Sequence, residues 1–120
     1  MTWERLRDET GRDTTLLRLA ELAEHGFPAK LQDVPGPLAQ FWRFRDRLSL
    51  VDGVIMYENR AVVPEKLRAE VLRNLHSAHQ GVTQMRGRAE TAVFWPGMTS
   101  DIQTTRERCL TCDRIAPSQR

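Results

Sequence analysis

Cysteine, lysine and tyrosine are scarce in this sequence of 120 residues, which contains two cysteines, two lysines and one tyrosine. So few cysteines exclude a small secreted scaffold held together by several disulfides. No apolar run approaches the roughly 20 residues that cross a bilayer, and the N-terminus lacks the pattern of a signal peptide. We therefore expect an intracellular protein without a membrane partner.

The scarcity of lysine is offset by arginine, which supplies 16 of the 18 basic residues. Residues 1–59 carry 8 basic and 10 acidic side chains, whereas residues 60–120 carry 10 basic and 6 acidic ones. Arginine binds phosphate through two parallel hydrogen bonds, so this bias fits a nucleic-acid partner. A solvated surface explains the same bias equally well, and charge alone does not identify the partner.

The first third of the chain has the periodicity of helices. A helix is predicted from a cap at Asp13 to a stop at Gly26, with a shorter helix before it around Trp3 and Leu6. Residues 30–37, which contain two prolines and a glycine, are a connector, and Pro37 suits the first turn of a further helix. The two longer helices carry, at helical spacing, Leu16, Leu19, Ala20 and Ala23 in one and Leu38, Phe41, Trp42 and Arg45 in the other.

Two short β-prone runs follow, at residues 54–57 and 61–63, on either side of Glu58, Asn59 and Arg60. This pattern predicts a β-hairpin with a small apolar face. A lone hairpin is only marginally stable, so we expect it to pack on the helices.

From Pro64 the sequence predicts three more helices. The first begins at Pro64 or Glu65, carries an apolar stripe and delivers His76, and Gly81 ends it. A second is expected over residues 83–92 with an interruption at Gly87, followed by a turn over residues 94–97. A third helix, capped by Thr99 or Ser100, runs into Cys109. The apolar stripe of the first helix consists of Leu67, Val71, Leu72 and Leu75.

Two histidines and two cysteines form the pattern that carries chemistry. His76 and His79 are three residues apart, so they lie on one helix face, and Cys109 and Cys112 have the spacing of a thiolate zinc knuckle. Two imidazoles and two thiolates complete a tetrahedral Zn²⁺ site and leave no position open for an activated water. The four residues therefore predict one structural zinc ion, not a hydrolytic one.

A redox role for the cysteine pair is the main alternative to a metal site. It would require the pair to lie between a strand and a helix, whereas Cys109 and Cys112 follow a charged helical stretch. A groove-reading zinc finger also fits poorly, because there the cysteines precede the histidines by about 12 residues. Here the histidines come first, and residues 80–108 separate the two pairs.

The stretch from His76 to Pro117 resembles the zinc-binding N-terminal domain of retroviral and gypsy-type retrotransposon integrases. The preceding DGVIMYENRAVVPEKLRAEVLRNL resembles the lead-in of gypsy-type integrases, and residues 1–50 are similar to the helical stretch upstream of it in retroelement polyproteins. This branch allows the short gap between the histidines, whereas Thr105 and Arg106 replace an apolar pair that the family often carries. The matching features are HxxHxG at 76–81, Trp95-Pro96-Gly97-Met98, Asp101-Ile102 and CxxC at 109–112.

The resemblance implies a mainly α fold, with a helical extension over residues 1–50, a β-hairpin linker over 51–64 and a zinc-stapled three-helix bundle over 65–120. It implies a nuclear module that helps integrase to multimerise and to hold the ends of element DNA. Its partners would be those DNA ends, the integrase catalytic domain and other integrase protomers, in a homo-oligomer. The basic residues that we expect to contact DNA are Arg86, Arg88, Arg106, Arg108 and Arg114.

Catalysis in the family uses three acidic metal ligands in a separate domain that follows this one, and no such segment lies between Cys112 and Arg120. We therefore expect a fragment of an integrase polyprotein, or a gene product derived from one, without enzymatic activity of its own. A different reading remains open. The chain could be a host-domesticated protein–protein interaction module that keeps zinc only for folding.

Overall fold

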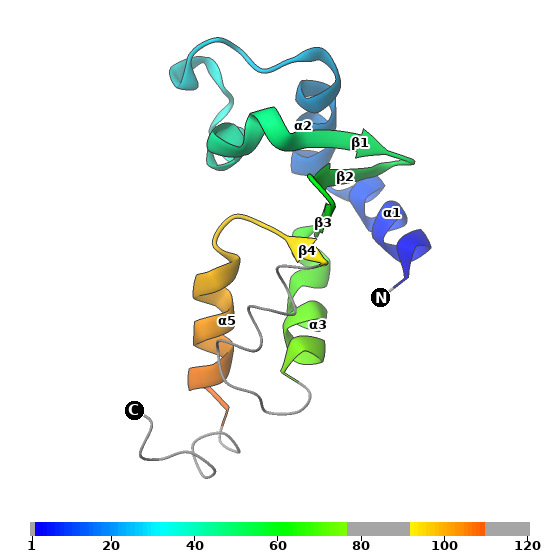
Figure 1. The fold of residues 1–120 in the computed structure, drawn as a ribbon, viewed down its shortest axis with the longest axis vertical. Helices are drawn as coiled ribbons and strands as arrows, with labels where there is room; N and C mark the ends of the chain where they lie inside the picture. The colour runs from blue at the N-terminus through cyan, green and yellow to red at the C-terminus, as the bar shows by residue number, and fades with distance from the viewer. Residues whose placement is uncertain (1, 77–91, 110–120) are drawn as a thin grey trace.

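A computed structural model describes residues 2–76 and 92–109 of the chain (Figure 1). His79, Cys112, Arg86, Arg88, Arg114 and nearly all of the helix predicted over residues 83–92 lie outside the described residues. The described part is mostly helical with one small sheet, as the sequence predicts. Within it, no helix combines the length and the apolar composition needed to span a bilayer.

The N-terminal helices form where the sequence places them. Helix α1 (Trp3–Arg12) is capped by the Thr2 side chain, and α2 (Thr14–His25) is capped by Asp13, whose Oδ1 accepts a 3.0 Å hydrogen bond from the Leu16 amide. Gly26 ends α2 with a φ of 104°, a conformation that glycine adopts without strain. The predicted cap and stop are confirmed.

The helix expected after Pro37 is present but is a 3₁₀-helix. Element η2 (Gly36–Arg47) follows the short 3₁₀-turn η1 (Leu31–Asp33). Its inward apolar positions, Leu38, Phe41 and Phe44, recur every three residues, which is the period of a 3₁₀-helix.

The predicted hairpin is part of a larger sheet. Strands β1 (Leu48–Val51), β2 (Val54–Tyr57) and β3 (Arg60–Val62) are antiparallel neighbours, and β4 (Val93–Phe94) pairs with β3 in parallel. Among the described residues, the sheet therefore has four strands in the order β1-β2-β3-β4. The sequence analysis was wrong to stop at two strands. Residues 48–50 of β1 were predicted to end the helical extension, and Phe94 of β4 was predicted to begin a turn.

Side chains alternate across this sheet and divide the interior into two cores, because successive residues of a strand point to opposite faces. Val54, Ala61, Val63 and Val93 face one core, and their neighbours in the chain face the other. We call the first the metal-side core; it consists of Leu6, Val54, Ala61, Val63, Leu67, Val71, Leu75, Val93, Trp95, Met98 and Ile102. The second, the distal core, consists of Leu16, Leu19, Val34, Leu38, Phe41, Leu48, Ile55, Val62 and Phe94.

The two cores separate the helices into two groups. Helix α1, α3 (Glu65–Leu75) and α5 (Met98–Glu107) contribute to the metal-side core, whereas α2 and η2 contribute to the distal core. Each core draws on residues before and after Pro64. The sheet is thus a layer between helices. The division of the chain at residues 50 and 64 stays a prediction, as does the zinc-stapled three-helix bundle.

Candidate metal centre

Helix α3 carries His76 to its C-terminal end. The helix begins directly after Pro64 and is fixed to the core by Leu67, Val71 and Leu75. His76 is the residue after the last helical one, and its amide donates a 3.0 Å hydrogen bond to the Leu72 carbonyl. Only 8% of His76 is exposed to solvent, so the imidazole lies in the interior of the protein.

Helix α5 carries Cys109 in a comparable position. The helix begins at Met98, one residue before the predicted cap at Thr99, because Gly97 occupies the cap position with a φ of 85°. Arg108 ends it, and the amide of half-buried Cys109 donates a 3.3 Å hydrogen bond to the Arg106 carbonyl. Two predicted ligands from opposite ends of the motif therefore both lie just beyond a helix C-terminus.

Figure 1 shows that α3 and α5 lie side by side and run in the same direction, and the two helices are in contact. This direction follows from the sheet, since β3 and β4 are parallel neighbours and each leads through a proline into its helix. His76 and Cys109 consequently lie at the same end of the molecule. The structure brings one histidine and one cysteine of the predicted set to the same end.

The packing between α3 and α5 determines whether these two ends stay together. Ile102, which is fully buried, and Met98, which is 6% exposed, extend from α5 into the core that Leu67 and Val71 line from α3. Apolar burial contributes roughly 1.5–3 kcal/mol for a side chain of this kind. Thr105 takes the first position of the apolar pair that the family often carries. Its hydroxyl donates a 2.9 Å hydrogen bond to the Asp101 carbonyl of the preceding turn.

Trp95 anchors the start of α5. Its side chain is 1% exposed, and its indole Nε1 donates a 2.8 Å hydrogen bond to Asp101 Oδ2. Asp101 lies in the first turn of α5, where a carboxylate is favoured by the helix dipole. The guanidinium of Arg68 on α3 lies 5.7 Å from the centre of the indole ring. Trp95 therefore links the two helices in addition to filling the core.

Arg68 is a cation that the sequence analysis missed. Its Nε donates a 3.1 Å hydrogen bond to the Val63 carbonyl, and burial lowers the pKa of Arg68 from its usual value. Nearby carboxylates, Glu65 first, then Asp13 and Asp101, act in the opposite direction. No pattern in the sequence indicates that Arg68 is buried. An arginine three residues after Glu65 on a short helix is common and gives no indication of burial.

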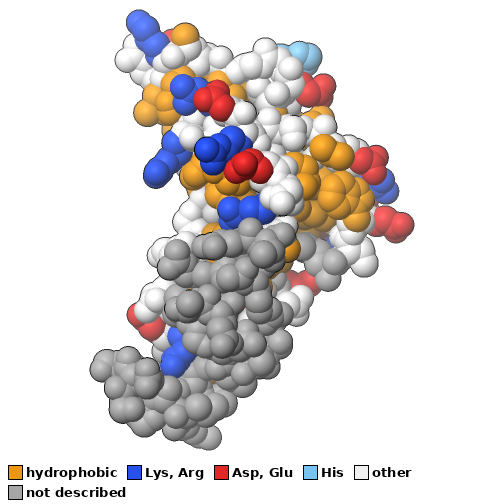
Figure 2. Space-filling view, in the orientation of Figure 1, with side chains coloured by type: hydrophobic (Ala, Val, Ile, Leu, Met, Phe, Trp, Pro, Cys, Tyr) orange, Lys and Arg blue, Asp and Glu red, His pale blue; other side chains and the backbone are white. Residues whose placement is uncertain are grey.

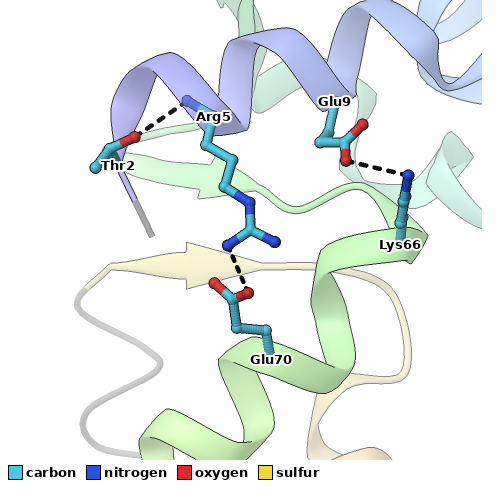
Figure 3. A network of polar contacts seen from close by, with 5 residues as sticks. All are labelled: Thr2, Arg5, Glu9, Lys66 and Glu70. Carbon is cyan, nitrogen blue, oxygen red and sulfur yellow. Dashed lines mark hydrogen bonds and ion pairs between the residues drawn. The ribbon is translucent and has the colours of Figure 1, made fainter.

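The N-terminal helix braces α3 from the other side (Figure 3). Arg5 forms an ion pair with Glu70. Lys66 Nζ lies 3.5 Å from Oε2 of Glu9, whose side chain is only 9% exposed. Leu6 of α1 enters the metal-side core between these two pairs. The helix that bears His76 is thus held by the extension that precedes the motif.

The end of the molecule where α3 and α5 stop suits a cation. The C-terminus of a helix carries a partial negative charge from its unpaired carbonyls, and both helices end there. An imidazole and a thiolate are ligands that zinc prefers. Within residues 2–76 and 92–109, no group of three potential ligands is gathered. The other two predicted ligands, His79 and Cys112, are not among these residues.

Two of the predicted DNA-contacting arginines are described. Arg108 is exposed and Arg106 is half-buried, both at the end of α5. The structure therefore places them beside Cys109, at the end of the molecule where the predicted ligand His76 also lies. Their role stays a prediction, and Arg86, Arg88 and Arg114 lie outside the described residues.

Comparison with known proteins agrees with this geometry. Residues 63–118 match the model of a family described as the integrase zinc binding domain. A stretch of 70 residues, or 58% of the chain, is 41% identical to an uncharacterized protein of Caenorhabditis elegans. The stretch spans only 6% of the length of that protein.

Residues 63–118, just under half of the chain, are therefore similar to the zinc-binding domains of integrases. This match begins one residue before Pro64 and includes α3, β4, α5 and all four predicted zinc ligands. The resemblance noted from the sequence is confirmed at the level of this family. Its narrower assignment to the gypsy-type branch stays a prediction.

Proposed function

We propose that His76, His79, Cys109 and Cys112 hold one structural zinc ion at the end of the α3–α5 pair. The observation that carries this proposal is the arrangement of two parallel helices that deliver His76 and Cys109 to one end of the molecule. Each remaining ligand follows its partner by three residues in the chain. Four protein ligands would leave the ion without an open position, which supports a structural role without catalysis by this chain.

Zinc would supply what apolar packing does not at this end. Structural zinc binding contributes about 10–16 kcal/mol near neutral pH, whereas a whole domain has a net stability of about 5–15 kcal/mol. The ion would therefore determine whether the ends of α3 and α5 stay together.

Elemental analysis combined with one substitution tests the zinc site. We expect about one zinc per chain, and its loss in Cys109→Ser, because the serine hydroxyl is a poor ligand for zinc. Arg18→Gln, at an exposed position of α2, is the control and should keep both the metal and the melting temperature. A Cys109→Ser protein that retains stoichiometric zinc would contradict the assignment.

We further propose that the module aids integrase multimerisation and binds the ends of retroelement DNA. The match of residues 63–118 to the integrase zinc-binding family supports an integrase context. The exposed Arg108 and the half-buried Arg106 offer cations at the end of α5. Phosphate contacts would make the affinity depend steeply on salt concentration.

A salt titration of binding to short duplex DNA tests this role. Each lost phosphate contact flattens the plot of log affinity against log salt by about 0.9. Arg108→Gln and Arg86→Ala should each reduce the slope by about this amount, whereas Arg18→Gln should not. Binding that is independent of salt would overturn the DNA role and favour a protein–protein interaction module that keeps zinc only for folding.

A further inference from the structure

A groove of about 580 Å³ opens beside the sheet, away from the ends of α3 and α5. A volume of this order lies in the range of ligand-binding clefts. Residues of η2, of the β2–β3 turn and of the segment from β4 into α5 line it, and Figure 1 shows this last segment as the yellow turn above α5. The residues on which the inference depends are Phe44, Tyr57, Arg60, Phe94 and Thr99.

Aromatic rings form one wall of the groove. The rings of Tyr57 and Phe94 are stacked, with centroids 4.3 Å apart, and Phe44 meets both edge-on at 5.4 and 4.8 Å. Phe94 is buried, whereas Tyr57 and Phe44 are half-buried. Two aromatic side chains of the cluster therefore remain in part accessible to a ligand.

Arg60 places a cation beside these rings. Its guanidinium carbon lies 5.1 Å from the centre of the Phe94 ring and 5.6 Å from that of Tyr57. Its Nε donates a 3.0 Å hydrogen bond to the Val93 carbonyl, which fixes the side chain. In the part of the chain that the structure describes, the two Nη groups have no hydrogen bond or ion pair. They are available to an anion.

The N-terminus of α5 lies at the same groove. Gly97 provides no side-chain cap, and among the described residues the amides of Thr99 and Ser100 have no acceptor. Such amides and the helix dipole favour a phosphate. Glu58, the acidic residue in the lining, lies 3.3 Å from Arg47, so its charge is partly balanced. Figure 2 shows both basic and acidic side chains among apolar ones in the upper part of this view.

We infer that this groove binds one unpaired nucleotide at the end of a DNA duplex. The base would stack on one accessible ring, Tyr57 or Phe44, and meet the other edge-on, because the two ring planes are 81° apart. Its phosphate would lie between Arg60 and the α5 N-terminus. A nucleotide requires an aromatic surface for its base and, next to it, hydrogen-bond donors for its phosphate. The groove offers this combination. The inference rests on the proposed binding of DNA ends and names the residues that would contact the unpaired nucleotide.

Fluorescence anisotropy with two probes of equal duplex length tests the inference, one blunt and one with a short single-stranded overhang. We expect the zinc-loaded parent to bind the overhang probe about ten-fold more tightly, a difference of about 1.4 kcal/mol that one stacked base can supply. Tyr57→Leu, Phe44→Leu and Arg60→Gln should each reduce this preference to near unity while affinity for the blunt probe stays similar.

Two variants outside the groove are matched controls. Trp3→Leu removes a partly exposed ring, and Arg18→Gln removes an exposed guanidinium; both should keep the preference. Circular dichroism establishes that each variant is folded, and the Phe44 variant provides a second test should Tyr57→Leu unfold. Equal binding of both probes by the parent, or an unchanged preference in the groove variants, would overturn the inference and leave duplex binding intact. Failure to bind the blunt probe would instead overturn the proposed DNA role.

Discussion

The two cores on opposite faces of the sheet are built from different kinds of chain segment. The distal core comes from residues 16–62 except for Phe94, so its elements follow one another in the sequence. The metal-side core joins α1, α3, β4 and α5, and a long segment of sequence separates α3 from β4. Local contacts cost less conformational entropy than distant ones. The distal core should therefore form by apolar packing alone, whereas the metal-side core should depend on the proposed zinc ion at the end of α3 and α5.

Removal of zinc should unfold the metal-side core while the distal core stays folded, and this is the largest effect that we expect. Chelation should expose the amides of α3 and α5 to hydrogen exchange, because the binding energy of a structural zinc is typically as large as the net stability of a whole domain. Helix α1 should lose protection with them, since Leu6 packs in the metal-side core and Arg5 pairs with Glu70. Helix α2 should stay protected.

Hydrogen exchange followed by mass spectrometry, with and without chelator, measures this difference for each helix. Protection that falls equally in α2 and α3 would show that the two cores unfold as one unit. Protection of α1 that persists while α3 exchanges would show that the N-terminal helix does not depend on the metal-side core.

Elements defined by local sequence were predictable. Asp13 as a cap, Gly26 as a stop and the hairpin on either side of Asn59 depend on neighbours in the chain, and all were found. Strand β4 was not predictable, because its two residues become a strand only by pairing with the distant β3. The 3₁₀ form of η2 had a signal in the repeated three-residue spacing of Leu38, Phe41 and Phe44.

The candidate site was predictable in its chemistry but not in its setting. The four ligands could be proposed from the sequence because zinc selects histidine and cysteine, and this ligand set stays a prediction. The side-chain contacts that support the site could not be predicted. Neither the contact of Arg68 with Trp95 nor the pairing of Lys66 with Glu9 follows from spacing, since each joins elements that the fold brings together. The groove at Tyr57 was missed for the same reason, because the rings of Phe44, Tyr57 and Phe94 come together only through the fold.

A matched pair of cavities should reveal which core depends on the metal. Ile102 and Leu19 are both fully buried, one in each core. Ile102→Ala and Leu19→Ala should each lower the free energy of unfolding by about 2–5 kcal/mol. Only Ile102→Ala should also weaken zinc retention, because Ile102 packs α5 against α3. Thermal melting and a chelator competition assay measure the two effects, and equal zinc loss in both variants would contradict the separation.

Loss of a helix cap should have a smaller effect, confined to the distal side. Asp13→Ala removes the acceptor of the 3.0 Å bond from the Leu16 amide and should cost about 1 kcal/mol. Asp13→Asn keeps a capping oxygen and is the matched control, with little change. Denaturant unfolding measures both. Zinc content should be unaffected in either variant, and a fall in zinc content would link α2 to the metal end.

The smallest effect should come from the ion pair between α1 and α3. The side chains of Arg5 and Glu70 are 51% and 22% exposed, so water screens their attraction. A double-mutant cycle with Arg5→Gln and Glu70→Gln should give a coupling energy of about 0.2–1 kcal/mol. Glu9→Gln should cost more than Glu70→Gln, because the Glu9 carboxylate is 9% exposed and has both Lys66 and Arg12 at 3.5 Å. Urea unfolding at low and high salt measures the coupling energy of Arg5 with Glu70 and the free-energy cost of Glu9→Gln. A coupling between Arg5 and Glu70 that persists at high salt would show that this pair, and not only Leu6, docks α1 on the helix that carries His76.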